Sequence, residues 1–207
     1  HKIFDYAKLA AGGATAAMNA ASSDENAFSL MRPPGHHAGK NFLGGFCYFN
    51  NIAVAVKLAL KKNDKIAIVD IDGHHGNGTQ DIFLGDKNVL FVSLHQKNAF
   101  PMSGFISSKN CLNYPLAPST RSEVYLDILD KALDNVTDFD PDMIAVSAGF
   151  DTYKLDPLLE LEIDKDAYFE IAAMISSLKK PVFAVLEGGY SSDLPECIEN
   201  FLHGLED

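Results

Sequence analysis

Five short runs of the chain are almost wholly apolar and rich in Val, Ile and Phe. They cover Ala27 to Met31, Lys65 to Ile71, Asn88 to His95, Met143 to Ser147 and Pro181 to Leu186. A strand with one solvated face would alternate apolar and polar residues, and these runs do not. The pattern therefore predicts parallel strands that are buried on both faces.

Helical periodicity fills the stretches between these runs. Apolar residues recur at three- and four-residue spacing in four ranges: Ile3 to Ala20, Asn50 to Lys62, Ser122 to Thr137 and Asp164 to Lys179. A further helix is predicted over Ser191 to Leu205, near the end of the chain. Strands that alternate with helices predict a three-layer α/β fold, in which helices cover both faces of a mostly parallel sheet.

The segment from Gln96 to Ser119 shows neither pattern. It contains three prolines and Gly104 and has little periodicity. We therefore expect a long ordered loop after a strand, and loops of that length usually carry function.

Length and composition predict one domain with a single hydrophobic core. The chain has 207 residues, of which 47% are hydrophobic, so we expect a single domain over residues 1–207. The formal net charge of -11 argues against direct nucleic-acid binding, which clustered Lys and Arg would favour, and is compatible with a basic substrate. The longest apolar stretches, such as Asn51 to Leu60, are shorter than the roughly 20 residues that cross a bilayer, so no membrane span is expected.

The three cysteines are odd in number, far apart and in no C-x-x-C pair. They predict neither a disulfide framework nor a thiolate zinc site and favour a reducing compartment. We expect a cytoplasmic location, or a nuclear one in a eukaryote. The oligomeric state is left open.

Candidate chemistry follows the predicted strands. In open parallel sheets, ligands bind beyond the carboxyl ends of the strands. Acids, histidines and a tyrosine stand at four of those ends, and we expect them to face one rim: Asp70, Asp72 and His74; His95; Asp151; Glu187 and Tyr190.

Asp72 and His74 are the first candidates for metal ligands. If the backbone stays extended, Asp70, Asp72 and His74 share one side because side chains alternate with period two. Asp151 is the best candidate for a third ligand, which would complete a catalytic zinc site with one open position. The alternative is that Asp72 and Asp151 cap the helices that follow their strands.

Two tandem histidines, His36 and His37, lie in the run R-P-P-G-H-H-A that ends at Ala38. Imidazoles titrate near neutral pH, so they can take a proton from an attacking water and return it to a leaving amine. Asp70 and Asn77 are well placed to bond their far ring nitrogens, and a carboxylate raises imidazole basicity more than an amide does. The alternative is a pair of ordinary solvated or capped histidines.

The motifs occur in an ordered set. The runs R-P-P-G-H-H-A, G-G-F-C-Y-F-N-N, D-I-D-G-H-H-G-N-G-T-Q, S-A-G-F-D and L-E-G-G-Y have the order and approximate spacing seen in the histone deacetylase and acetylpolyamine amidohydrolase family. The chain resembles this family over essentially its whole length. Asn77 is similar to the class II and bacterial branches, because class I enzymes carry Asp at the matching position.

The resemblance implies a zinc-dependent deacetylase and assigns roles by motif. Its zinc ligands would be Asp72, His74 and Asp151. The general base would be His37, with His36, paired with Asp70, as its companion. It also implies a structural potassium ion held partly by Asp70, Asp72, His74, Ser93 and Leu94.

The same resemblance implies how the substrate is held. Tyr190 would donate its phenol to the oxyanion, and the Gly45 carbonyl would accept the substrate N–H. Phe46 and Phe100 would wall a narrow tunnel around the acyl-lysine stem. Acetylated lysine in proteins, acetylated polyamines and other small acetylated amines all remain open as substrates.

Relative to the family, the chain is expected to lack the N-terminal portion of the domain. It would begin at a helix that normally follows an opening strand and a pocket-lining loop. We expect it to keep the zinc site, because the assigned residues lie downstream of Met31, but to lack one wall of the tunnel.

Two other functions compete with a deacetylase. A binuclear manganese ureohydrolase of the arginase type requires D-x-H-x-D and D-x-D, whereas this chain has one acid in each place, Asp72 and Asp151, which favours a single metal. An acetyl-lysine binding module without turnover is the second rival, and Tyr190 argues against it because weakly active members carry His there. A nucleotide-binding enzyme is poorly supported, because no G-x-G-x-x-G follows a strand.

Overall fold

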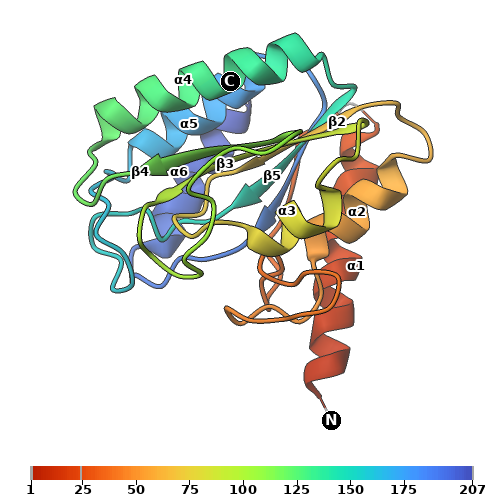
Figure 1. Ribbon diagram of the computed structural model, residues 1–207, viewed down its shortest axis with the longest axis horizontal. Helices are drawn as coiled ribbons and strands as arrows, with labels where there is room; N and C mark the ends of the chain where they lie inside the picture. Colours follow the sequence, from red (N-terminus) through yellow and green to blue (C-terminus); the bar gives the residue numbers. More distant parts are fainter. Residues whose placement is uncertain (1, 24, 207) are drawn as a thin grey trace.

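Six strands pair into one sheet in the computed structural model, which describes residues 2–23 and 25–206 (Figure 1). The strands are β1 (Ala27–Ser29), β2 (Ile66–Asp70), β3 (Val89–Gln96), β4 (Cys111–Leu116), β5 (Met143–Ala148) and β6 (Val182–Leu186). Their order is β1-β6-β5-β2-β3-β4, and every neighbouring pair is parallel. The carboxyl ends of all six strands therefore lie at one edge of the sheet.

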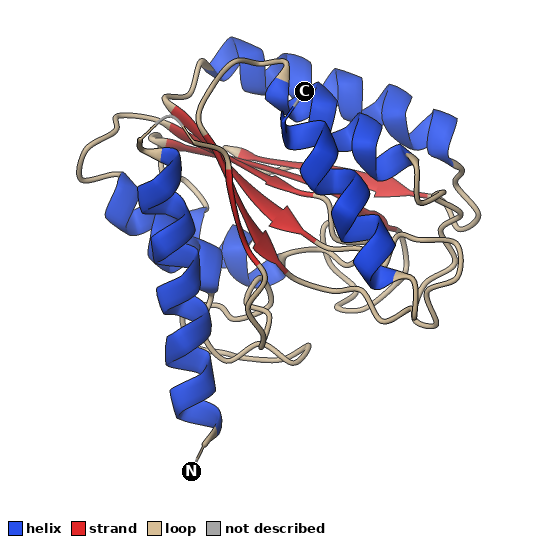
Figure 2. Cartoon of the chain, turned by 180° about the vertical axis from the view of Figure 1, so that it is seen from behind, coloured by secondary structure: helices blue, strands red, loops and turns tan. Residues whose placement is uncertain are grey.

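Helices cover both faces of the sheet (Figures 1 and 2). One face carries α1 (Ile3–Ala21), α2 (Asn51–Ala59) and α3 (Asn77–Phe83), and the other carries α4 (Ser122–Phe139), α5 (Ala167–Ser176) and α6 (Leu194–Glu206). The residues of β2 alternate between the two resulting cores. Ile66 and Ile68 pack with α1 and α2, whereas Ala67 and Val69 pack with α4, α5 and α6. A strand with two apolar faces explains the continuous apolar runs in the sequence.

The predicted three-layer α/β fold is confirmed, and the five predicted strands and five predicted helices are all present, with ends that differ by up to three residues. The prediction of one unbroken loop from Gln96 to Ser119 is wrong, because β4 lies within it. That strand is at the edge of the sheet and pairs only with β3. Pro115 has no N–H to donate, and an edge strand tolerates this because it has no second neighbouring strand to bond. The apolar pattern of β4 is hard to recognise in the sequence, because the strand contains Asn113 and Pro115 and is partly exposed.

The short helix α3 was also missed. It has seven residues and no side-chain N-cap, and it contains Gly78. A Cβ at Gly78 would lie 2.4 Å from the backbone of Ala38, so the helix packs closely against the loop that follows the tandem histidines. Contacts with a distant loop therefore define this helix more than its own periodicity does. Within the described residues, no helix is long and apolar enough to cross a bilayer.

Candidate active site

The carboxyl ends of the central strands β2 and β5 bring two acids and a histidine together. Asp72 and His74 lie in the turn after β2, and Asp151 lies just after β5. His74 Nδ1 is 2.6 Å from Asp151 Oδ2 and 3.3 Å from Asp72 Oδ1. One ligand atom of each residue lies within 4.8 Å of the others, which is compact enough for a single ion.

Backbone amides orient the two carboxylates. Asp151 Oδ1 accepts from Gly73 N at 2.7 Å, and Asp72 Oδ2 accepts from Gly188 N at 2.7 Å. The approach requires glycine, because a Cβ at Gly188 would lie 2.6 Å from both carboxylates. The remaining oxygens are thereby turned toward His74.

The strand β2 ends at Asp70, yet Asp70 and Asp72 still face the same side, because Asp70 Oδ2 and Asp72 Oδ1 lie 3.0 and 3.7 Å from the nitrogens of His36. Asp72 Oδ1 also lies 3.3 Å from His74 Nδ1. The helix-capping alternative does not hold. The next helix, α3, has Gly76 as its N-cap, and the carboxylates of Asp72 and Asp151 bond loop amides.

The local charge of the cluster suits a cation. Burial opposes protonation of His74, but its hydrogen bonds to Asp151 and Asp72 outweigh that effect and raise its pKa to about 10. Burial and the charge of Asp72 raise the pKa of Asp151 to about 7. Two buried carboxylates facing one imidazole make a site that a bound cation would neutralise.

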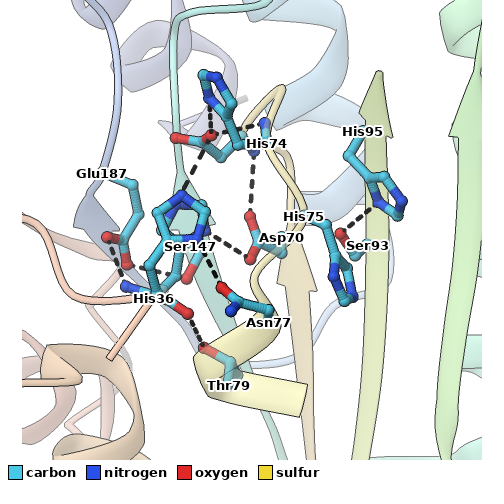
Figure 3. Close-up of polar contacts among 12 residues, drawn as sticks. His36, Asp70, His74, His75, Asn77, Thr79, Ser93, His95, Ser147 and Glu187 are labelled. Carbon is cyan, nitrogen blue, oxygen red and sulfur yellow. Dashed lines mark hydrogen bonds and ion pairs between the residues drawn. The ribbon is translucent and has the colours of Figure 1, made fainter. Parts of the chain in front are cut away.

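The loop after β1 carries the tandem histidines to the same place (Figure 3). His36 Nδ1 is 3.0 Å from Asp70 Oδ2, and His37 Nδ1 is 2.8 Å from Asn77 Oδ1, as the sequence analysis predicted. Both histidines are buried, and their ring centroids are 4.0 Å apart. They are therefore fixed members of the site and not solvated loop residues.

The two histidines have opposite electrostatics. Burial opposes a charge on His36, yet the neighbouring Asp72, Asp70 and Glu187 raise its pKa well above the usual range. Burial and the charge of His36 lower the pKa of His37 to about 3. At neutral pH, His37 is thus the imidazole that can accept a proton.

Glu187 anchors this loop, a role that the sequence did not reveal (Figure 3). Its Oε2 accepts from the backbone N–H groups of Gly35 and His36 at 2.7 and 3.1 Å, and its Oε1 accepts from Ser147 Oγ at 3.1 Å. The side chain is fully buried. It ties the end of β6 to the loop after β1 and to β5.

A pocket of about 440 Å³ opens above these residues. Its lining consists of His37, Gly45, Phe46, His74, Phe100, Leu158 and Tyr190. The structure therefore brings all three predicted substrate-contacting residues to the same cavity as His37, His74 and Tyr190. Leu158 was not predicted, because nothing in its local sequence distinguishes it from a core leucine.

Tyr190 faces this pocket from the loop after β6. Its ring lies 6.0 Å from that of Phe46, and the Arg32 guanidinium lies 5.4 Å from its centroid. Burial, together with the charges of Asp72 and Asp151, raises the pKa of Tyr190 above its usual range. The phenol therefore stays protonated at neutral pH and can donate a hydrogen bond.

His95 does not reach the pocket rim, so that expectation is wrong. It is buried within β3, with Nδ1 2.9 Å from Ser93 Oγ and Nε2 3.0 Å from the Gly104 carbonyl. His75 lies beside it and bonds Ser103 Oγ at 2.7 Å. The two histidines hold the loop that carries Phe100, because Ser103 and Gly104 lie three and four residues after it.

Fold and site together define a three-layer α/β protein with a compact carboxylate and imidazole cluster at the strand ends. The family profile described as "Histone deacetylase domain" matches residues 1–205. This chain belongs to the histone deacetylase family, as its ordered motifs predicted.

Individual relatives agree with this assignment. The chain is 42% identical to a probable deacetylase of Archaeoglobus fulgidus, over 91% of this chain and 57% of that protein. It is 38% identical to acetylpolyamine amidohydrolase 1 of Pseudomonas aeruginosa, over 80% of this chain and 51% of that protein. An acetylpolyamine aminohydrolase from Burkholderia pseudomallei has a crystal structure that matches with a TM-score of 0.90 at 33% identity, over 94% of this chain and 60% of that one. The chain thus spans between half and two thirds of the length of these relatives.

Proposed function

We propose that this chain is a zinc-dependent deacetylase that hydrolyses acetylated amines and releases acetate. The observation that carries the proposal is the convergence of the Asp72, His74 and Asp151 cluster with His37 and Tyr190 at one pocket. These residues come from the ends of four different strands. Family membership and the names of the similar proteins support the same activity.

The donor set fits a single zinc ion. Zinc binds imidazole nitrogens and carboxylate oxygens, and its catalytic sites have three protein ligands with a fourth position open. Among the residues that the structure describes, no other group of three or more such side chains is this compact, which favours one metal over the binuclear alternative. The potassium ion near Asp70, Asp72, His74, Ser93 and Leu94 and the cytoplasmic location stay predictions.

When bound, zinc would polarise the amide carbonyl and lower the pKa of a water molecule toward about 7. The residues of the chain supply the proton transfers. Asn77 Oδ1 can only accept, so His37 Nδ1 carries the hydrogen and Nε2 keeps a free lone pair for the proton of the attacking water. Asp70 holds the His36 ring, which packs against the His37 ring and fixes its orientation.

The remaining pocket residues position the substrate. The Tyr190 phenol would donate to the developing oxyanion, a kind of contact whose loss lowers kcat roughly 10²–10³-fold. The Gly45 carbonyl would accept the amide N–H, and the rings of Phe46 and Phe100 would flank the stem. Acetylated polyamines and acetylated lysine both present a neutral amide on a flexible stem, and both are proposed as substrate classes.

Metal analysis combined with a substrate panel tests the proposal. We expect about one zinc per chain, activity toward at least one of acetyl-lysine peptide, acetylputrescine and acetylspermidine, and loss of both zinc and activity in Asp151→Ala. The control is Asp142→Ala, which removes a carboxylate just before the amino end of β5, at the end of the sheet opposite the pocket. Two tightly bound manganese ions, or full zinc occupancy in Asp151→Ala, would contradict the assignment.

A further inference from the structure

Asp156 is a buried carboxylate near the pocket with no part in the metal cluster. Its Oδ2 accepts from Tyr190 N at 2.7 Å, and its Oδ1 accepts from Leu158 N at 3.0 Å. Only 7% of the residue is exposed. Each of its two oxygens therefore holds the backbone of a different residue that lines the pocket.

Tyr190 needs such an anchor because the backbone before it can adopt many conformations. Gly188 and Gly189 precede it, and Gly189 has φ of 121°, a conformation that residues with a side chain rarely adopt. On the other side, Arg32 donates from Nη2 to the Gly189 carbonyl at 2.8 Å. The peptide group between Gly189 and Tyr190 is thus tied at its oxygen by Arg32 and at its nitrogen by Asp156.

Asp156 also belongs to the loop that carries a candidate metal ligand. It follows Asp151 by five residues, and its own N–H donates to the Tyr153 carbonyl at 2.8 Å, which closes a tight turn between them. The hydrogen bond to Tyr190 therefore fixes the loop after β6 to the loop after β5. Phe150 N also donates to the Gly188 carbonyl, at 3.1 Å, but the bond from Asp156 is the one that acts on Tyr190 itself.

We propose that Asp156 is a positioning residue that sets Tyr190 for oxyanion stabilisation and Leu158 as a wall of the pocket. The proposal rests on the proposed deacetylase function. Asp156 acts through the two residues and has no contact with the reacting atoms. Because misplacement by about 1 Å can lower a rate roughly a hundredfold, one hydrogen bond at this point has a large effect.

Asp156→Asn is the informative change, because an amide has the same shape but only one acceptor oxygen. It must give up the bond to Tyr190 or the bond to Leu158, and its NH₂ group then faces a backbone N–H. A double-mutant cycle with Tyr190→Phe separates positioning from general loss of structure. The control for the Asp→Asn change itself is Asp142→Asn, an exposed residue at the start of β5 whose Oδ2 accepts from the backbone N–H groups of Asp64 and Lys65, far from the pocket.

The measurements are kcat, KM, zinc content and Tm for wild type, both single variants, the double variant and the control. We expect Asp156→Asn to keep zinc and to lower kcat about 10- to 100-fold, with a smaller rise in KM. In the Tyr190→Phe background, the same change should lower kcat less than about threefold, because the hydroxyl that it positions is gone. Asp142→Asn should leave kcat and KM unchanged.

The outcomes are separable. Full activity in Tyr190→Phe would overturn the oxyanion role and with it the proposed mechanism. An inactive Tyr190→Phe combined with an unaffected Asp156→Asn, or with additive losses in the double variant, would overturn the positioning role alone. If Asp156→Asn proves unstable, Asp156→Glu keeps both acceptor oxygens on a longer stem, and the same cycle and the same criteria apply to it.

Discussion

At the residue scale, the two adjacent histidines owe their different properties to their partners. His36 bonds a carboxylate and lies near two more, whereas His37 bonds the amide of Asn77. Burial opposes a charge on both rings; at His36 the carboxylates of Asp72, Asp70 and Glu187 outweigh it and raise the pKa, whereas at His37 burial and the charge of His36 lower the pKa. This asymmetry supports a division of roles in which His37 accepts the proton.

Changing Asn77→Asp should reduce the asymmetry. A carboxylate beside His37 raises its pKa, typically by about 1–3 units. The neutral form of His37 accepts the proton, so activity is lost as pH falls through this pKa. The acid limb of kcat/KM against pH should therefore move upward by at least about one unit.

The pH profile of kcat/KM for the two proteins measures this shift. The control is Asn19→Asp, which introduces the same charge at an exposed position of α1. An acid limb that stays in place would mean that His37 is not the proton acceptor.

Sequence motifs identified the residues with chemical character but not their supports. Asp72, His74, Asp151 and both tandem histidines were predicted, and the structure brings them together. Glu187 binds the backbone amides of Gly35 and His36, and Asp156 binds that of Tyr190, and each of these pairs is more than 30 positions apart. Such pairings leave no periodic signal along the chain, so only the fold reveals them.

At the element scale, the pair α5 and α6 packs closely because of one glycine. A Cβ at Gly204 in α6 would lie 2.2 Å from the Phe169 carbonyl oxygen and 2.9 Å from the Ala172 side chain in α5. Gly12 in α1 has no atom within 4 Å of the same position and is exposed. The two helical glycines therefore form a natural comparison.

Gly204→Ala should destabilise the protein and Gly12→Ala should stabilise it. Alanine gains up to about 1 kcal/mol over glycine in a helix interior. At Gly204 the overpacking penalty of about 1–3 kcal/mol exceeds that gain, because backbone atoms must move. Denaturant unfolding of both variants gives the two signs. A stabilised Gly204→Ala would show that α5 and α6 are less tightly packed than described.

The elements that sequence predicted are those with their own apolar period. The helices α1, α2 and α4 and the central strands each carry enough apolar residues to be recognised alone. The exceptions, α3 and β4, are short and contain glycine or proline. They form because tertiary neighbours supply the partners, and local patterns do not encode those partners.

At the scale of the whole molecule, the proposed metal ligands Asp72, His74 and Asp151 follow the two central strands of the sheet, β2 and β5. A metal that binds only the folded state stabilises it by about 2.7 kcal/mol when its free concentration is 100 times Kd. For a protein of this size that corresponds to a rise in Tm of roughly 5–10 °C. Added zinc should therefore raise Tm, and a chelator should lower it.

Thermal unfolding with zinc and with chelator measures this effect without reference to activity. Asp151→Ala should lose the zinc-dependent shift, whereas Asp142→Ala should retain it. An equal shift in all three proteins would mean that zinc stabilises the chain from some other site.

The strand order also governs how the chain acquires its shape during synthesis. The edge strand β1 pairs only with β6, so Ala27 has no strand partner until Phe183 has been synthesised. The neighbouring strands β2 and β5 can pair as soon as β5 has been synthesised, which is earlier. Pairings between such distant segments form slowly, because a large loop must close first. A nascent chain therefore contains Asp72, His74 and Asp151 before it contains Glu187, which holds the loop of the tandem histidines, and Gly188, whose N–H orients Asp72. Interrupted synthesis between Asp151 and Val182 would leave a product that carries every proposed metal ligand and the tandem histidines, but lacks the Glu187 carboxylate that anchors their loop and the Tyr190 phenol.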